Sequence, residues 1–446
     1  MVLGVRLASG EPTRGSDGMH DRIKQRTHWA VTHGIARAYL KVLARRGEPV
    51  AQLGIDTAHA ADIYRFIDKI RARGRMSKFG DGWFTADAQI VRTIFRDNRF
   101  VTFKPEHRSG SPIIKRLAAW SDPQLLNPAE PPSILITDPP DHGRLRRLVA
   151  APFTPRAIES LRGRIKEVTD GHLDALQQRQ NPDLIADFTA KIPIAVIGEM
   201  IAVPPQDYSR LYTAMNRAIQ LIATTAPSWR EYQDGTEALR EIDAYLEKHV
   251  AYLRREGTES ELATALLDSD LSHFELKMFF AVFLGAGFVT TTHLMGKAIV
   301  TLLRHPDQLA ALHADPELWP NAVEELMRYD TSNQWSARVA TETVEIEGHT
   351  IEAGQSALLL LGGANRDPAA FENPDVFDIT RPNARENITL GTGIHVCLGQ
   401  VLARVELHTA LQSLFERFPR LSLAGEPEYY AGMGIHGLRR LPVTLG

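Results

Sequence analysis

The single cysteine of this chain, Cys397, lies in a glycine-rich segment whose residue types and spacing can position a reactive sulfur. Residues 390–399 read LGTGIHVCLG. A lone thiol excludes an intrachain disulfide and a zinc or iron–sulfur site built from several cysteines. Three interpretations remain: an inert buried thiol, a nucleophile, or a single thiolate ligand to a metal. A helix is expected to begin directly after Cys397, and its dipole and unpaired N–H groups would stabilise a thiolate.

The neighbours of Cys397 help to separate these interpretations. Gly391 and Gly393 suggest a dinucleotide-binding loop, but the third glycine stands at the wrong spacing and no strand clearly precedes it. Cys397 and His395 form a conceivable nucleophile pair, yet residues two apart do not face each other on a helix, and no clear third partner is visible. Glycines let another body approach the backbone closely. A loop that presents one anionic sulfur to a flat ligand therefore favours haem iron.

The composition is that of an ordinary globular protein. The chain has 446 residues and a net charge of -3, which allows a large core and argues against nucleic acid as a partner. One cysteine indicates a reducing compartment, and no secretory signal opens the chain, so a cytoplasmic location is expected. Residues 1–18 are expected to form a disordered extension, and residues 19–57 a helical segment.

Two stretches have the composition of membrane-associated helices. Residues 22–46 are basic and amphipathic, and they either lie on a membrane surface or dock on the protein's own core; we favour docking. The uncharged run from Met278 to Gly296 is about long enough to span a bilayer. Its glycines, threonines and His293 instead indicate a helix buried within the protein. No stable membrane insertion is therefore expected.

Helical patterns dominate from residue 58 onward. The alternation from Val344 to Ile351 predicts a hairpin that turns at Gly348-His349, and Ser356–Leu361 has the pattern of a buried strand. A long ordered loop is expected over residues 364–387, and a helix over residues 398–418. The predicted fold class is mainly α with small β-sheets, with the cysteine at a junction between loop and helix.

The segment around Cys397 resembles the haem-binding loop of the cytochromes P450, and four further motifs appear in the order of that family. They are DPPDH at 138–142 running into RLRR at 144–147, AGFVTT at 286–291, ELMR at 325–328, and ANRDP at 364–368 with FDITR at 377–381. The resemblance is to the soluble, ferredoxin-dependent bacterial type, and the overall sequence resembles actinobacterial members of the family. It implies the cytochrome P450 fold as a single domain over residues 58–446.

The resemblance implies a haem b cofactor and a role for each motif. The residues expected to contact the haem are His142, Arg146, Ala286, Gly287, Arg338, Leu390, Gly391, His395, Cys397 and Gly399. Of these, Cys397 would ligate the iron, and the histidines and arginines would hold the haem carboxylates. Thr290 would be the catalytic hydroxyl that supports dioxygen. The loop that presents the cysteine would be held by a buried ion network of Glu325, Arg328 and Arg381.

The implied activity is monooxygenation, in which one oxygen atom of dioxygen enters an apolar small molecule. Electrons would come from a ferredoxin and an NAD(P)H-dependent ferredoxin reductase, since nothing in the chain resembles a flavin or nicotinamide module. Arg144 and Arg147 lie on a different helix face from His142 and Arg146. They form either solvated surface charge or part of a basic patch that docks an acidic electron carrier.

Val289 departs from the family pattern, which places an acid directly before the threonine. In the family the acid and the alcohol relay protons to dioxygen, and a valine cannot carry a proton. Three explanations stay open. Water with the hydroxyls of Thr291 and Thr292, or His293, supplies the path; the enzyme uses peroxide or performs a rearrangement; or the acid is expendable. Leu390 is a second departure, because the family usually has phenylalanine there.

Two alternative functions follow from the departure at Val289. One is a peroxide-dependent or non-oxygenating haem-thiolate enzyme. The other is a haem-containing binding or sensor protein with weak turnover. Turnover with a redox partner would separate both from a monooxygenase.

Overall fold

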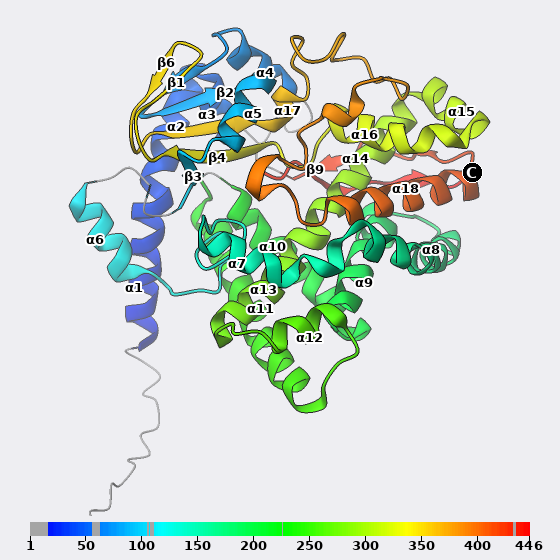
Figure 1. Ribbon diagram of the computed structural model, residues 1–446, viewed down its shortest axis with the longest axis horizontal. Helices are drawn as coiled ribbons and strands as arrows, with labels where there is room; N and C mark the ends of the chain where they lie inside the picture. The colour runs from blue at the N-terminus through cyan, green and yellow to red at the C-terminus, as the bar shows by residue number, and fades with distance from the viewer. Residues whose placement is uncertain (1–16, 56–62, 105–106, 108–110, 225, 431–433) are drawn as a thin grey trace, which may run out of the picture.

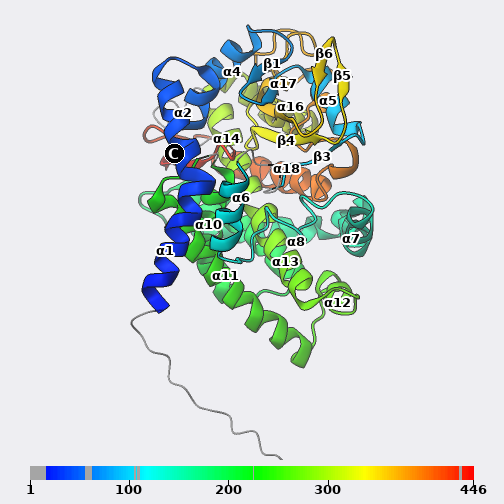
Figure 2. The same ribbon diagram turned by 90° about the vertical axis from the view of Figure 1, so that its left-hand side faces the viewer.

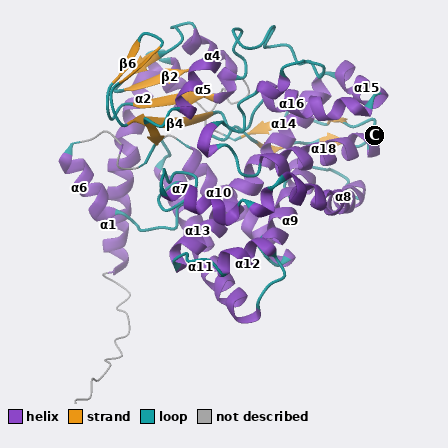
Figure 3. Cartoon of the chain, viewed as in Figure 1, coloured by secondary structure: helices purple, strands orange, loops and turns teal. Residues whose placement is uncertain are grey.

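The computed structural model consists of a large helical body with a β-rich corner (Figure 1, Figure 3). It describes residues 17–55, 63–104, 107, 111–224, 226–430 and 434–446. The larger sheet gathers at one corner together with several N-terminal helices, and the C-terminus lies on the side away from that corner (Figure 1). The predicted fold class, mainly α with small β-sheets, is confirmed.

A five-stranded sheet joins segments that are far apart in the sequence. Its order is β1-β2-β7-β4-β3; β2 and β7 are parallel, and the other neighbours are antiparallel. The strands are β1 (Ser77–Phe79), β2 (Gly82–Thr85), β3 (Phe100–Thr102), β4 (Trp335–Ala340) and β7 (Ser356–Leu360). Arg338 of β4 lies opposite Thr102 of β3. The sheet therefore fixes the position of one of the expected haem contacts.

The predicted hairpin forms, but its turn lies one residue earlier than expected. β5 (Val344–Ile346) and β6 (His349–Ile351) pair antiparallel, with His349 already in the ladder. Glu347 and Gly348 make the turn, with φ of 50° and 78°. A two-residue turn with positive φ at both central positions matches the twist of the paired strands, which explains the shift.

The segments around the glycine-rich loop follow the predicted outline with shifted ends. β7 stops one residue early because the short helix α17 (Leu361–Ala364) begins there. The long loop contains a 3-10 turn, η9 (Ala384–Glu386), and the helix after the cysteine is α18 (Gln400–Arg417). Two small sheets near the C-terminus pair β8 (Ser422–Leu423) with β11 (Val443–Thr444), and β9 (Glu428–Tyr429) with β10 (Leu438–Arg440).

A long buried helix crosses the centre of the molecule. It consists of α13 (His273–Leu284), the π-helical segment η7 (Gly285–Val289) and α14 (Thr290–Arg304). Its length and composition would allow it to cross a membrane, but 83% of its most apolar window is buried. It is therefore a core helix, as expected for Met278–Gly296.

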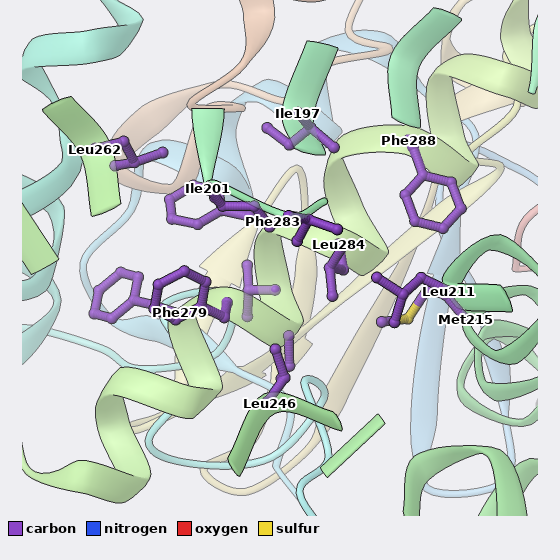
Figure 4. Close-up of a cluster of buried hydrophobic side chains, with 14 of the residues drawn as sticks. Ile197, Ile201, Leu211, Met215, Leu246, Leu262, Phe279, Phe283, Leu284 and Phe288 are labelled. Carbon is purple, nitrogen blue, oxygen red and sulfur yellow. The ribbon is translucent and has the colours of Figure 1, made fainter. Parts of the chain in front are cut away.

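Other helices pack around this central helix. Side chains of α9 (Lys191–Met200), α10 (Tyr208–Ala223) and α11 (Trp229–Glu256) form an apolar cluster with Phe279 and Phe283 of α13 (Figure 4). Further helices are α4 (Ile63–Arg71), α5 (Ala88–Arg96), α7 (Asp141–Val149), α8 (Pro155–Gln177), α12 (Glu261–Leu267), α15 (Pro306–Ala314) and α16 (Trp319–Tyr329).

The N-terminal helices lie along one side of the body (Figure 2). α1 (Asp17–Trp29) continues through η1 (Ala30–Gly34) into α2 (Ile35–Arg45), and α3 (Pro49–Ile55) follows. Trp29 Nε1 donates a hydrogen bond to the Pro227 carbonyl at 3.0 Å, so the predicted helical segment docks on the protein. The disorder predicted for residues 1–18 falls outside the described residues, except that the last two residues already form the first turn of α1.

Candidate functional site

Backbone contacts fold the glycine-rich loop tightly in front of α18. The Cys397 N–H donates to the Leu390 carbonyl at 2.9 Å. Gly391 and Gly393 have φ of 71° and 75°, a conformation that suits glycine. A side chain on Gly393 would lie 2.3 Å from the carbonyl oxygen of Phe95. The two glycines therefore let the loop turn and approach the end of α5.

The Cys397 thiol is half-buried, and desolvation raises its pKa. The Gly399 N–H and the charges of Arg146 and Arg404 act in the opposite direction, but burial is the larger effect. The N–H at the helix start therefore favours the thiolate as expected, but desolvation disfavours the anion more strongly. A metal cation reverses this balance, since a coordinated thiol loses its proton.

Four basic side chains converge near this loop. The rings of His142 on α7 and His395 lie 4.2 Å apart between centroids. Arg146, one turn after His142, is close enough for its charge to lower the pKa of His142 and of the cysteine. Arg338 lies in the same region as His142. The charge of Asp138 is close enough to both side chains to raise the pKa of each, although burial has the larger effect. The four side chains expected to bind the haem carboxylates are thus brought together from a helix, a strand and a loop.

Two basic side chains of this cluster are desolvated by burial, and neither has a carboxylate in hydrogen-bonding contact among the described residues. Arg338 is 7% exposed, and it donates to a serine hydroxyl and a backbone carbonyl at 3.2 and 2.9 Å. Burial lowers the pKa of Arg338 to about 10. Burial, and then the charges of His395 and Arg146, lower the pKa of His142 to about 4. His395 Nε2 lies 3.6 Å from Asp138, beyond hydrogen-bonding distance. The residues present therefore fit a ligand that brings its own carboxylates.

Sequence reasoning missed the acid at the centre of this cluster. Asp138 accepts hydrogen bonds from the Thr102 N–H and hydroxyl, both at 2.9 Å, and pairs with Lys104 at 2.9 Å. Burial opposes its ionisation, but the basic His395 and these donors hold the pKa of Asp138 well below its usual range. Asp138 thereby ties β3 to the start of α7. Its place at the head of the DPPDH motif was the available signal.

The central helix exposes one short face in the middle of its buried length. Ala286 is exposed and Thr290 is half-buried, whereas Phe288 and Val289 are buried. Thr290 Oγ1 donates to the Ala286 carbonyl at 2.9 Å, across the π-helical segment. Ser332 Oγ donates to the Thr290 carbonyl at 3.1 Å, which ties this face to the segment that leads into β4. An accessible alanine in a core helix gives a ligand room to approach.

Gly287 and Val289 contact other helices rather than the accessible face of the central helix. A side chain on Gly287 would lie 2.9 Å from Ile197 Cγ1, so this glycine lets α9 pack against the central helix. The expectation that Gly287 leaves room above the cofactor is replaced by this packing role, and the open side belongs to Ala286. Val289 is 1% exposed and belongs to the same apolar cluster as Phe279 and Phe283.

The alternative proton carriers on this helix are enclosed. Thr291 Oγ1 donates to the Gly287 carbonyl of its own helix at 3.4 Å. Thr292 and His293 are fully buried, and their side-chain polar atoms have no hydrogen-bond partner among the described residues. Burial, and then the charge of Lys297, lower the pKa of His293 to about 4, so its ring is neutral at pH 7.

The expected buried ion network is present. Glu325 pairs with Arg328 at 2.7 Å and with Arg381 at 3.2 Å, and the side chains are 0%, 0% and 6% exposed. Arg328 Nη1 also donates to the carbonyls of Asn365 and Pro374, both at 2.9 Å. The network therefore anchors the long loop that leads to the cysteine.

The two arginines proposed for carrier docking differ in environment. Arg144 pairs with Glu275 at 2.9 Å and with Asp270 at 3.6 Å, so it links α7 to the start of α13. Arg147 is exposed. Arg96, which the sequence did not single out, donates to the Thr392 hydroxyl of the cysteine loop at 3.2 Å. Arg96 and Arg147 thus leave exposed positive charge near the loop, whereas Arg144 is already paired with acids of the same protein.

Fold and site together are those of a haem-thiolate protein. One cysteine stands just before a long helix, basic side chains gather beside it, and a core helix offers an accessible face with a threonine hydroxyl. These are the parts that a cysteine-ligated haem requires.

Known proteins resemble this chain over most of its length. The Cytochrome P450 family model matches residues 120–428. Cytochrome P450 CYP107DY1 of Priestia megaterium is 40% identical over 380 residues, which cover 82% of this chain and 90% of that protein. Cytochrome P450 140 of Mycobacterium tuberculosis is 35% identical over 435 residues, which cover 95% of this chain and 98% of that protein. The crystal structure of P450BioI with an acyl carrier protein ligated to hexadec-9Z-enoic acid has a TM-score of 0.80 at 34% identity, covering 87% and 99%.

The chain belongs to the cytochrome P450 family. It is therefore a haem-binding oxidoreductase of the monooxygenase type, and its cofactor is haem b.

Proposed function

We propose that this enzyme inserts one oxygen atom of dioxygen into an apolar small molecule, and that the Cys397 thiolate would hold the iron of haem b. The observation that carries this proposal is the group of basic side chains beside the cysteine loop, two of which are desolvated by burial. Burial lowers the pKa of Arg338 and of His142, and within the described part of the chain neither has a carboxylate in hydrogen-bonding contact. When bound, the haem supplies dioxygen-activating redox chemistry, and a thiolate ligand favours cleavage of the O–O bond.

The remaining contacts follow the same arrangement. The haem carboxylates would be held by Arg146, Arg338, His142 and His395. The cysteine side of the haem is lined by Leu390, Gly391 and Gly399, and a side chain added to Gly399 would meet no atom within 4 Å. The opposite side would border the central helix at Ala286, which is exposed. The backbone of Gly287 completes that border.

Thr290 presents the catalytic hydroxyl at the accessible helix face. Its Oγ1 donates to the Ala286 carbonyl at 2.9 Å, and rotation about χ1 redirects it to a ligand. Since Thr292 and His293 are sealed in the core, we propose that water along the Ala286 face delivers the protons. Among the explanations for Val289, this supports water as the path.

Electrons are proposed to come from a ferredoxin and its NAD(P)H-dependent reductase in the cytoplasm. The support is positive charge close to the cysteine loop: Arg147 and Arg96 are exposed, and the Arg385 side chain is 81% exposed. An acidic carrier would be steered to this side, and its reduction rate would fall with added salt. Reduction of the haem by ferredoxin at increasing ionic strength measures this directly.

The ligand assignment is tested on the ferrous carbonyl complex of the holoenzyme. We expect a thiolate-type Soret band, and we expect Cys397→Ser to lose that band while far-UV circular dichroism still reports a folded chain. A thiolate-type band that persists in Cys397→Ser would refute the assignment, because the chain has no second thiol.

The reaction type is tested by the oxidant that supports turnover. Product formed with reductant, ferredoxin and dioxygen supports monooxygenation. Product formed with peroxide alone would favour a peroxide-dependent enzyme, and ligand-induced spectral shifts without any product would favour a binding or sensor protein. Ligands are first screened for a high-spin shift of the haem spectrum, because the sequence does not identify the substrate.

A further inference from the structure

Exposed apolar side chains concentrate on the N-terminal side of the molecule. Within the described part of the chain, seven of the twelve large apolar residues that are exposed lie on α1, α2 and α6 (Pro112–Ser121). These seven, which we call the N-terminal apolar surface, are Ile23, Ile35, Tyr39, Val42, Ile113, Leu117 and Trp120. Since isolated exposed apolar residues are ordinary, it is their concentration on three neighbouring helices that needs a cause.

Two of these helices expose an apolar stripe at helical spacing. The α2 residues of the surface stand at positions i, i+4 and i+7 and are 57%, 56% and 45% exposed. The α6 residues repeat that spacing with exposures of 70%, 39% and 50%. Leu40, on another face of α2, is 9% exposed. α2 is therefore apolar toward the protein and, on a second face, apolar toward solvent.

Direct contacts join the helices that carry these stripes. His28 Nδ1 lies 3.2 Å from the Ala118 carbonyl, which holds α1 against α6. Lys24 Nζ lies 5.6 Å from the centroid of the Trp120 ring, so a cation accompanies an exposed aromatic residue. α1 continues into α2, and α6 runs beside α1 on the same side of the molecule (Figure 2). The stripes therefore belong to one side of the protein.

The charge around this surface is opposite in sign to that of the whole protein. Residues 21–46 contain seven lysine and arginine side chains and one aspartate, and residues 111–121 contain two basic residues and no acid. The whole chain has a net charge of -3. Exposed basic residues near the stripes include Arg22, Arg26, Lys41, Arg45 and Arg116.

We propose that the N-terminal apolar surface docks on the face of an anionic lipid membrane. Apolar stripes accompanied by lysine and arginine are typical of helices that lie in a bilayer interface. A second copy of this chain is a poorer occupant, because two-fold pairing would place the same basic helices against each other. Within the described residues, the one helix long enough to span a bilayer is buried in the core, so the proposed attachment is peripheral.

Flotation of the full-length holoenzyme with vesicles tests this proposal, with Soret absorbance as the measure of bound protein. Vesicles of phosphatidylcholine with about a third phosphatidylglycerol are compared with pure phosphatidylcholine. We expect roughly ten-fold stronger partition to the anionic vesicles. Salt raised to about 0.5 M should remove most of this difference, because the attraction is screened. Equal partition to both vesicles, or to neither, overturns the proposal.

Matched variants locate the contact. The stripe variant is Ile35→Ser/Tyr39→Ser/Val42→Ser, and the control replaces three apolar residues of similar exposure elsewhere, Tyr252→Ser/Phe274→Ser/Val376→Ser. We expect the stripe variant to lose about ten-fold in binding and the control to stay within about two-fold of the parent protein. Lys41→Glu/Arg45→Glu gives a second test that leaves all packing residues in place, and it should also weaken binding to anionic vesicles.

Two further outcomes would contradict membrane docking. A stripe variant that binds like the parent protein would remove the stripe from the contact. If sedimentation without lipid showed the parent protein to be a dimer and the stripe variant a monomer, the surface would be assigned to contact with a second copy. Both are measurable on haem-loaded protein, independently of turnover.

Discussion

Glu406 is an acid buried in α18, and its replacement by glutamine is expected to stabilise the protein. The residue is 1% exposed, and burial raises its pKa from an ordinary 4.5 to about 8. The native protein therefore keeps this proton at pH 7, whereas the unfolded chain releases it. Each pKa unit corresponds to 1.36 kcal/mol, so the acid costs about 3 kcal/mol of stability at pH 7 and about 5 kcal/mol above pH 8.

The sign of the pH dependence is fixed by the direction of this change. A raised carboxyl pKa leaves stability intact below about pH 4.5 and removes it progressively as the pH rises toward 8. Glu406→Gln abolishes that loss, so its advantage should grow from about 1 kcal/mol at pH 5.5 to about 4 kcal/mol at pH 7.5.

Urea unfolding of the holoenzyme, followed by far-UV circular dichroism at both pH values, measures this difference. Glu416→Gln is the control, because Glu416 is exposed on the same helix, and it should show no such trend. An advantage of Glu406→Gln that is the same at both pH values, or a variant less stable than the parent at pH 7.5, would refute the reasoning.

Three other substitutions test the site and its support. Val289→Asp should cost about 3–5 kcal/mol in urea unfolding at pH 7.5, because Val289 is 1% exposed among apolar side chains; Val289→Thr, as a control of similar shape, should cost far less. Arg381→Met should cost about 3–5 kcal/mol and speed haem loss to apomyoglobin, since Glu325 loses one of its two buried cations. Lys297→Met should lower the free energy of unfolding by about 3–5 kcal/mol, because the Lys297 side chain is 0% exposed and pairs with Asp330 at 2.8 Å. For each of the three variants, an unchanged urea midpoint would contradict the prediction.

Local sequence signals predicted the elements whose determinants are themselves local. Periodicity and length identified the central helix and α18, and alternation identified the hairpin. The turn was misplaced by one residue, since hydrophobic alternation does not report φ. Positive φ at Glu347 and Gly348 decides where that chain reverses.

The candidate site was predicted less evenly, because side-chain direction depends on tertiary packing. Motif spacing brought His142, His395 and Arg338 to the correct neighbourhood, since the family order reflects a common fold. It misjudged Gly287, whose missing side chain makes room for Ile197, a residue ninety positions away in the chain. It also missed how strongly burial opposes ionisation of the cysteine. Both errors concern contacts between distant segments, which no local pattern records.

The absence of an acid before Thr290 is consistent with the way the central helix directs its side chains. Consecutive helical residues point about 100° apart, so the residue next to Thr290 leaves the accessible face. Val289 does so and packs in the apolar cluster, where a carboxylate would be desolvated without a partner. An acid at this position is therefore useful only if its surroundings supply a cation or solvent. With an apolar cluster there, valine is the compatible residue, and proton supply falls to the face that Ala286 and Thr290 share.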